Sequence, residues 1–211
     1  SDTFEFSVMT DLLRTFTAIA INPSPLLVQI LNELQNKLSA EPVKWVNPAN
    51  LHLTLKFLGD TRPSQADEIS EELRLVAQLF SPFSFKLEGL GYFKNKGIPR
   101  VLFARIKEGE ELQHLAAEID KRLANLGFQP ETRPFKPHLT LGRIKFLKNK
   151  KAFYQTAEEY RETFIQTVTI GELIFYQSIL KPEGPEYKPL GGFALRGHSR
   201  FPITAPTGLP G

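Results

Sequence analysis

The chain has 211 residues with four histidines and no cysteine, and 41% of its residues are hydrophobic, which is enough for one sizeable core. The missing cysteine excludes disulfide scaffolds, thiolate metal sites, iron–sulfur clusters and a catalytic thiol. The net charge of +3 permits an acidic or phosphorylated ligand without requiring one.

Strand and helix patterns follow one another along the chain. Strands are predicted over residues 16–21, 43–46, 51–58, 83–90, 101–106 and 138–144, with one or two more within 163–180 and a last one within 187–195. Helices are predicted over residues 25–38, 64–80, 110–126 and 148–162. This order predicts an α+β fold in which helices cover antiparallel sheet.

The sequence lacks the patterns of a membrane span and of a secretory signal, and this predicts the location of the protein. Every apolar stretch is well short of the roughly 18 residues of a membrane span. No basic region precedes an apolar stretch at the N-terminus, so we expect no secretory signal and a cytoplasmic location.

The tetrapeptide His-Leu-Thr-Leu occurs twice, at residues 52–55 and 138–141. On a strand, a histidine and a threonine two positions apart point to one side, while the two leucines point to the other. Each copy therefore anchors itself in a core and presents an imidazole beside a hydroxyl. A helix and a proline-marked entry precede both copies, which indicates a duplication. If a pseudo-twofold axis relates the halves, both imidazoles and both hydroxyls meet in one cleft.

Two imidazoles and two hydroxyls suit phosphoryl chemistry. The unperturbed histidine pKa is about 6.5, so near neutral pH one ring can take a proton from an attacking water while the other donates one to the leaving oxygen. The threonine hydroxyls can donate to the non-bridging phosphoryl oxygens. The residues themselves leave open which of His52 and His138 is the acid and which is the base. The chain has no glycine-rich nucleotide loop and no cluster of histidines and carboxylates at metal-ligand spacing.

The paired His-x-Thr-Leu strands resemble the signature of the 2H phosphoesterases, and among them the LigT-like RNA 2′,3′-cyclic phosphodiesterases, also called 2′-5′ RNA ligases. Further segments agree with that family: Arg14-Thr15-Phe16-Thr17-Ala18-Ile19, Lys44-Trp45-Val46, Leu55-Lys56-Phe57-Leu58-Gly59, Phe135-Lys136-Pro137-His138, Ile174-Phe175-Tyr176-Gln177-Ser178 and Gly184-Pro185-Glu186-Tyr187. The resemblance covers residues 13–196, which predicts a single bilobal domain. Residues 1–12 are then an N-terminal extension and residues 197–211, rich in proline, glycine and threonine, a C-terminal tail.

The resemblance implies a fold, a reaction and a set of site residues. The fold would have two pseudo-symmetric lobes of antiparallel sheet covered by helices, with a central cleft that carries the two His-x-Thr strands. The enzyme would hydrolyse the 2′,3′-cyclic phosphodiester at an RNA end to a 2′-phosphomonoester, without a metal or another cofactor. His52 would be the general acid that protonates the 3′ oxygen, and His138 the general base that activates water. Thr54 and Thr140 would bind the phosphate, and Arg143, two positions after the second motif, would be a further phosphate ligand.

Strict alternation makes a different prediction for Arg143. Five positions after His138, its side chain falls on the opposite face of the strand. It reaches the cleft only if the strand ends or bulges near Gly142, which a glycine permits.

The same alternation places Lys56 in phase with His52 and Thr54 and makes it a second candidate for a phosphate contact. It assigns Phe57 to the core face.

The predicted partner is RNA or an oligonucleotide with a 2′,3′-cyclic phosphate end, without a membrane or an obligate protein partner. Two alternatives stay open. The same residues could serve 2′-5′ RNA ligation or cleavage of 2′-5′ phosphodiester bonds, or the chain could be a non-catalytic module that binds RNA ends.

Overall fold

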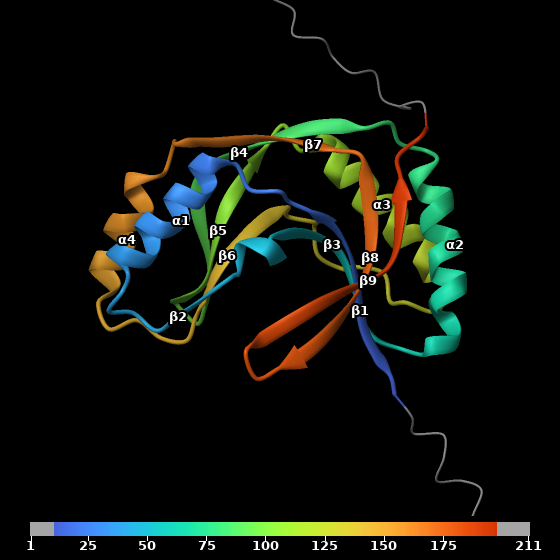
Figure 1. Cartoon of the computed structure of the whole chain (residues 1–211), viewed down its shortest axis with the longest axis horizontal. Helices are drawn as coiled ribbons and strands as arrows, with labels where there is room; N and C mark the ends of the chain where they lie inside the picture. Colours follow the sequence, from blue (N-terminus) through green and yellow to red (C-terminus); the bar gives the residue numbers. More distant parts are fainter. Residues whose placement is uncertain (1–10, 198–211) are drawn as a thin grey trace, which may run out of the picture.

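In the computed structural model, which describes residues 11–197, two antiparallel sheets stand side by side with α-helices on their outer faces (Figure 1). The first sheet has the strand order β3–β1–β8–β9 and consists of β1 (Leu13–Ala20), β3 (His52–Thr61), β8 (Glu172–Lys181) and β9 (Gly184–Ala194). The second has the order β2–β6–β5–β4–β7 and consists of β2 (Val43–Trp45), β4 (Phe83–Asn95), β5 (Ile98–Lys107), β6 (His138–Ile144) and β7 (Phe164–Ile170). The predicted α+β class with paired antiparallel sheets is confirmed.

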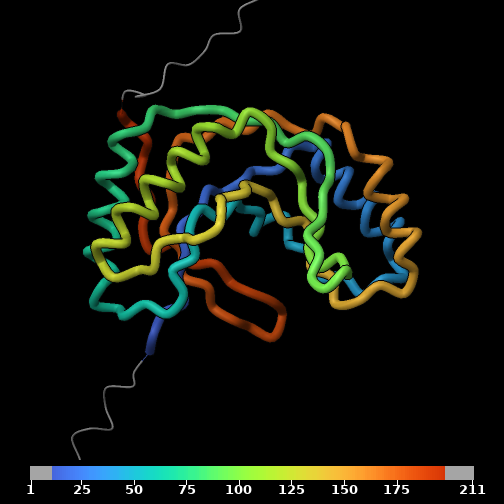
Figure 2. The backbone as a smooth tube through the Cα atoms, turned by 180° about the vertical axis from the view of Figure 1, so that it is seen from behind, coloured from blue at the N-terminus to red at the C-terminus, as the bar shows by residue number. Residues whose placement is uncertain are grey.

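The helices are divided between the two sheets. They are α1 (Pro25–Lys37), α2 (Ala66–Ala77), α3 (Glu110–Ala124) and α4 (Lys150–Glu159), with short 3-10 turns at Pro48–Asn50 and Pro63–Gln65. Contacts join α1 to β7 and α4 to β4, whereas α2 and α3 pack on each other and on the first sheet. Each pair therefore covers one end of the molecule, as both views show (Figures 1 and 2).

The connectivity carries the internal duplication that the sequence indicated. Apart from the short β2, the order β1–α1–β2–β3–α2 in the first half is matched by β5–α3–β6–α4 in the second. In each half the first helix crosses over to the other sheet, and the chain then returns to form its motif strand. Because the chain crosses between the sheets repeatedly, the two lobes are interleaved.

One continuous hydrophobic core lies beneath both sheets and holds the leucines of both tetrapeptides. Leu53, Leu139 and Leu141 are fully buried, and Leu55 is 4% exposed. Burial of these side chains fixes which way each motif strand faces, because turning a strand over would move its leucines into water.

A local signal places the start of α1 where the sequence predicted it, whereas α2 and α4 are two or three residues shorter than predicted at each end. The Ser24 hydroxyl accepts a hydrogen bond from the Leu27 amide at 3.1 Å and so caps α1, with Pro25 at its first position. No helix in the described part of the chain is long and apolar enough to cross a membrane. The predicted extension and tail fall almost wholly on residues 1–10 and 198–211, outside the described residues.

The structure corrects the prediction for Lys56. The pairing of β3 with β1 shifts between Lys56 and Thr54, so Leu55 is the extra residue of a β-bulge. Lys56 consequently points into the protein with only 1% of its side chain exposed, and it makes no contact with the cleft. Its ammonium donates to Asp120 at 2.6 Å and to the Gln129 carbonyl at 2.9 Å. This buried ion pair ties β3 to α3 and to the loop that leads to β6.

We expect the two halves of this ion pair to differ in their contribution to stability. Asp120→Ala leaves the ammonium of Lys56 buried without its main counter-charge and should lower the free energy of unfolding by about 3–5 kcal/mol. Lys56→Met should cost less, because Asp120 is 24% exposed and still accepts from the Glu131 amide. Urea unfolding of the two single variants and of the double variant measures this. A larger loss for Lys56→Met than for Asp120→Ala would contradict it.

Candidate active site

A second β-bulge, in β6, decides the side to which Arg143 points. The pairing of β6 with β5 shifts at Leu141, which leaves that residue unpaired in the ladder. Across the bulge, His138, Thr140 and Arg143 pair with every second residue of β5 from Arg105 back to Val101. Since alternate residues of a strand share a face, these three polar side chains lie on the same side of the sheet. The bulge that the sequence required for Arg143 is therefore present.

Gly142 makes room for this arrangement. A side-chain carbon on Gly142 would lie 2.8 Å from Val43 and 3.1 Å from Trp45, both on the neighbouring β2. A larger residue at position 142 would push β2 away from the bulge.

The bulge at Leu55 gives β3 the same pattern. His52, Thr54 and Phe57 pair with every second residue of β1 from Ala20 back to Phe16 and so share one face. Phe57 is 53% exposed, so the prediction that it belongs to the core is wrong. On the cleft face, β3 therefore has the pattern His-x-Thr-x-x-Phe, and β6 has the pattern His-x-Thr-x-x-Arg.

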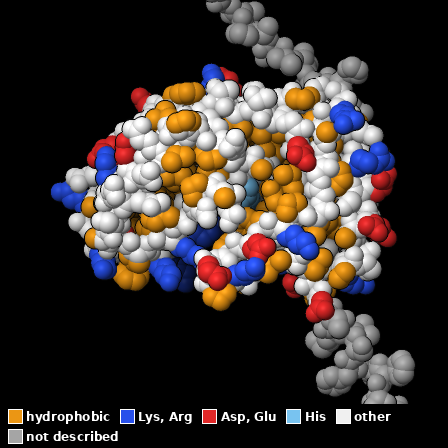
Figure 3. Space-filling view, in the orientation of Figure 1, with side chains coloured by type: hydrophobic (Ala, Val, Ile, Leu, Met, Phe, Trp, Pro, Cys, Tyr) orange, Lys and Arg blue, Asp and Glu red, His pale blue; other side chains and the backbone are white. Residues whose placement is uncertain are grey.

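The two faces converge on one site. Besides burial, which has the largest effect, the positive charge of Arg143 lowers the pKa of both His52 and His138, and a charge on His138 lowers the pKa of His52 further. Burial raises the pKa of the Tyr187 phenol, and the charge of Arg143 opposes this rise. Tyr187 comes from β9 of the first sheet. Side chains of both lobes thus lie within electrostatic reach of one another. A histidine surface is visible in a hollow between the two halves, with hydrophobic side chains around it (Figure 3).

Backbone carbonyls hold both imidazoles in the same tautomer. Nδ1 of His52 lies 2.8 Å from the Asn50 oxygen, and Nδ1 of His138 lies 2.9 Å from the Lys136 oxygen. A carbonyl can only accept, so Nδ1 carries the hydrogen in each ring. Nε2 is therefore the atom of each neutral imidazole that can accept a proton, and the atom of each imidazolium that can donate one.

Aromatic rings fix the orientation of each imidazole. The His52 ring lies 5.1 Å from Phe16 and 4.8 Å from Tyr187, the second contact edge to face. The His138 ring lies 4.8 Å from Phe93 and 5.3 Å from Phe103, also edge to face. These contacts hold the rings in place before any ligand binds.

Burial is the main cause that lowers the pKa of both histidines below the usual value of 6.5. The positive charge of Arg143 acts in the same direction, whereas the carbonyls of Asn50 and Lys136 favour the protonated rings. Near neutral pH both imidazoles are consequently neutral in the free protein. A bound anion would raise the pKa of the nearer ring and draw a proton onto it.

The remaining predicted groups are available to a ligand. Among residues 11–197, the hydroxyls of Thr54 and Thr140 have no hydrogen-bond partner, and Arg143 has no ion-pair partner. Both threonines are partly exposed and Arg143 is exposed. Two hydroxyl donors and one guanidinium thus face the same space as the two imidazoles.

Sequence reasoning missed several residues on this face. Lys44 of β2 lies directly across from Arg143, and it is also exposed. Two like charges opposite each other repel, a cost that a bound anion would remove. Tyr187 and Phe93 contact the imidazoles, but they come from strands far away in the chain. Lys44 and Tyr187 lie in segments that resemble the family, but strand alternation assigns none of these residues to the site, because only the strand pairing brings them there.

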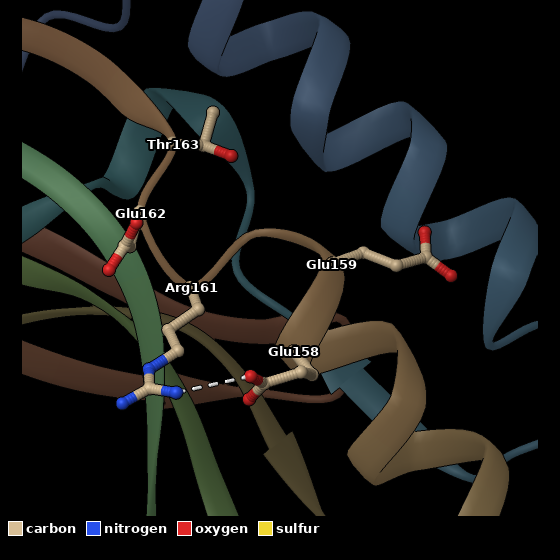
Figure 4. Close-up of a pocket in the computed structure, with 5 residues that line it drawn as sticks. All are labelled: Glu158, Glu159, Arg161, Glu162 and Thr163. Carbon is tan, nitrogen blue, oxygen red and sulfur yellow. Dashed lines mark hydrogen bonds and ion pairs between the residues drawn. The ribbon is translucent and has the colours of Figure 1, made fainter.

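Two further surface hollows are lined by neither His52 nor His138. The first is lined by Glu158, Glu159, Arg161, Glu162 and Thr163 at the end of α4, and Arg161 is paired there with Glu158 (Figure 4). Its three glutamates disfavour a phosphate. The second lies beside the entry to β6 and is lined by residues that include Glu108, Glu110, Lys136 and Pro137.

Comparison with known proteins assigns the chain to a family. The family model described as LigT like Phosphoesterase matches residues 19–103 and 106–187. The chain belongs to this family. An Archaeoglobus fulgidus protein named RNA 2′,3′-cyclic phosphodiesterase is 36% identical over 183 residues, which are 86% of this chain and 99% of that protein.

Solved structures with the same fold are also similar to this chain in sequence. A structure from Thermus thermophilus matches with a TM-score of 0.73 and 31% identity, over 88% of this chain and 99% of that one. Escherichia coli LigT in complex with 3′-AMP matches with a TM-score of 0.63 and 25% identity over the same shares.

The electrostatic coupling predicts how the two histidines titrate. In the free protein, NMR titration of the imidazole carbon-bound protons should give both His52 and His138 a pKa below 6.5. Arg143→Gln removes a positive charge that disfavours the imidazolium, so the pKa of both rings should rise. Arg143→Lys keeps the charge and serves as the control. Unchanged histidine pKa values in Arg143→Gln would contradict the coupling.

Proposed function

We propose that the chain hydrolyses the 2′,3′-cyclic phosphodiester at an RNA end to a 2′-phosphomonoester, with His52 and His138 as the acid–base pair. The observation that carries this proposal is the matched pair of imidazoles, each with Nδ1 bonded to a carbonyl and each beside a threonine hydroxyl. The family relatives named RNA 2′,3′-cyclic phosphodiesterase, among them the Archaeoglobus fulgidus protein, support the choice of substrate.

The phosphorus lies between the two rings in the proposed complex. Neutral His138 accepts a proton from water at Nε2, and the water oxygen attacks the phosphorus. The bond from phosphorus to the 3′ oxygen breaks, and Nε2 of protonated His52 donates its proton to that oxygen. The product keeps the phosphate on the 2′ oxygen. Transfer of the proton from His138 to solvent, and from solvent to His52, restores the starting state.

The pKa values of the free site suit this cycle. Both rings are neutral near pH 7 before the substrate binds, so the base is ready. The acid gains its proton when the anionic phosphate arrives, because the negative charge offsets the effects of burial and of Arg143. The assignment of His52 as the acid follows the family resemblance.

The hydroxyls and the guanidinium hold the phosphate in this mechanism. Thr54 and Thr140 donate to the two non-bridging oxygens, and Arg143 neutralises the charge that builds up on them in the transition state. Because Arg143 lies on the same face as His138 and Thr140, it can do so from the β6 side.

Single substitutions test the pair. His52→Ala and His138→Ala should each lower kcat by about 100-fold or more, because each removes one partner in proton transfer. The matched control is His114→Ala on α3, which should retain the wild-type kcat. The assay uses a cyclic-ended oligonucleotide and follows the phosphomonoester that is released. Wild-type turnover in a folded His138→Ala protein would exclude the mechanism.

Product analysis tests the direction of opening. Chromatography of the products of a nucleoside 2′,3′-cyclic phosphate should show the 2′-phosphate, since the 3′ oxygen is the leaving group. A 3′-phosphate would mean that the 2′ oxygen is protonated and would reverse the proposed geometry. Including an RNA with a 5′-hydroxyl in the same assay detects joined product, which is expected only if the site also ligates.

A further inference from the structure

Lys44 is a cation on the cleft face for which the proposed reaction has no use. It lies in β2, the edge strand of the second sheet, directly across from Arg143. Its neighbours Val43 and Trp45 point to the other face, because both would touch a side-chain carbon placed on Gly142. Strand alternation therefore places the Lys44 side chain on the same face as that of Arg143.

No carboxylate in the described part of the chain neutralises these two cations. Lys44 and Arg143 are both exposed, and neither forms an ion pair there. Glu41 is the acid closest to Lys44 in the sequence, but it accepts from the amides of Lys148 and Asn149 at 2.6 Å and 2.9 Å. Two positive charges thus stand on neighbouring strands, which are about 5 Å apart, without a counter-charge.

One of the two cations is sufficient for the reacting phosphate. A 2′,3′-cyclic phosphodiester carries a single negative charge, which one guanidinium offsets. Burial lowers the pKa of both imidazoles most, and the cation whose charge also acts on both of them is Arg143. Lys44, one strand farther from His138, has no such effect. Arg143 is therefore the cation at the reacting phosphate, and Lys44 is available to a second anion beside it.

An RNA chain supplies such a second anion. The 5′ oxygen of the terminal nucleotide carries a phosphodiester that links it to the preceding nucleotide and adds one negative charge. Lys and Arg side chains gather at the rim of the hollow on the side of β2 and β6 (Figure 3). Arg105, the exposed residue across from His138, extends elsewhere, since its Nε would lie 3.0 Å from a side-chain carbon on Gly91 of β4. The charge next to Arg143 is thus that of Lys44.

We propose that Lys44 binds the phosphodiester that links the terminal nucleotide to the rest of the RNA, while Arg143 holds the cyclic phosphate. This inference rests on the proposed function and deepens it, because it names the substrate class: ends of oligonucleotides are preferred to free nucleoside cyclic phosphates. An ammonium acts on phosphate as a point charge and reads no base, so the preference does not depend on sequence.

The test compares three substrates that differ in one charge. They are adenosine 2′,3′-cyclic phosphate, the dinucleotide ApA with a 2′,3′-cyclic phosphate end, and the same dinucleotide with an uncharged methylphosphonate linkage. The wild-type protein should have its highest kcat/KM on the charged dinucleotide. Lys44→Gln should lower that value by roughly 5- to 10-fold, mainly through KM. The same variant should leave kcat/KM unchanged on the other two substrates.

Two further variants separate charge from structure. Lys44→Arg keeps the positive charge and should retain most of the preference for the charged dinucleotide. Lys121→Gln is the matched control, because Lys121 is an exposed lysine in the last turn of α3. The slope of log kcat/KM against log salt concentration on the charged dinucleotide should become shallower by about 0.7 in Lys44→Gln and stay unchanged in Lys121→Gln. An equal loss on all three substrates, or no loss on the charged dinucleotide, would overturn the proposal.

A binding measurement distinguishes failure of this inference from failure of the proposed reaction. Calorimetry with adenosine 2′-monophosphate and with ApA that ends in a 2′-phosphate reports on the linking phosphodiester without turnover. If the wild-type protein hydrolyses none of the cyclic substrates, the proposed function fails. In that event, weaker binding of the dinucleotide to Lys44→Gln, without a matching loss for adenosine 2′-monophosphate, still supports the role of Lys44. Equal losses, or no loss, reject it.

Discussion

Two β-bulges, at Leu55 and Leu141, determine which side chains face the cleft. Each bulge lets two consecutive residues of a motif strand point to the core, and the next side chain then returns to the face of the histidine and threonine. In β6 this brings Arg143 to the site, and in β3 it brings Phe57 and buries Lys56. If both strands were regular, Lys56 would take the place of Phe57 on the cleft face, and Arg143 would point to the core. The buried leucines on the other face keep both bulges in register.

Interleaving of the two lobes joins both motif strands into one fold. In each half a helix crosses to the other sheet before the motif strand forms, so neither motif strand belongs to an independent unit. The ion pair between Lys56 and Asp120 adds a link between β3 and the segment that leads to β6. Together with the carbonyl bonds at Nδ1 and the surrounding aromatic rings, these contacts fix the imidazoles before substrate binds. Acid–base catalysis depends on such fixed positions, since proton transfer requires hydrogen-bond distance.

The two motif strands have the same spacing of histidine, threonine and bulge, but the side chains around them differ in charge and in aromatic character. The side of β6 carries Arg143 and Lys44, whereas the side of β3 carries Phe57 and the aromatic stack behind it. A nucleotide has the same division, with an anionic phosphate at one end and a flat base at the other. Burial and, to a smaller extent, the positive charge of Arg143 lower the pKa of both imidazoles, so in the proposed mechanism protonation of the acid is coupled to the arrival of the phosphate. The two motif strands supply one imidazole each, and the residue that follows each motif on the cleft face, Phe57 or Arg143, makes the two sides of the cleft differ.

The sequence by itself determined the fold class, most element positions and the repeated motif that points to the family. It could do so because the leucine and threonine pattern within each tetrapeptide is local and obeys strand alternation. It named His52, His138, Thr54 and Thr140, and for Arg143 it identified the bulge near Gly142 that the structure contains. It was wrong about Lys56 and Phe57, because a bulge depends on pairing with a neighbouring strand. Only the tertiary structure decided these two residues and brought Lys44, Phe93 and Tyr187 to the site, since they come from strands that meet only when the two sheets form.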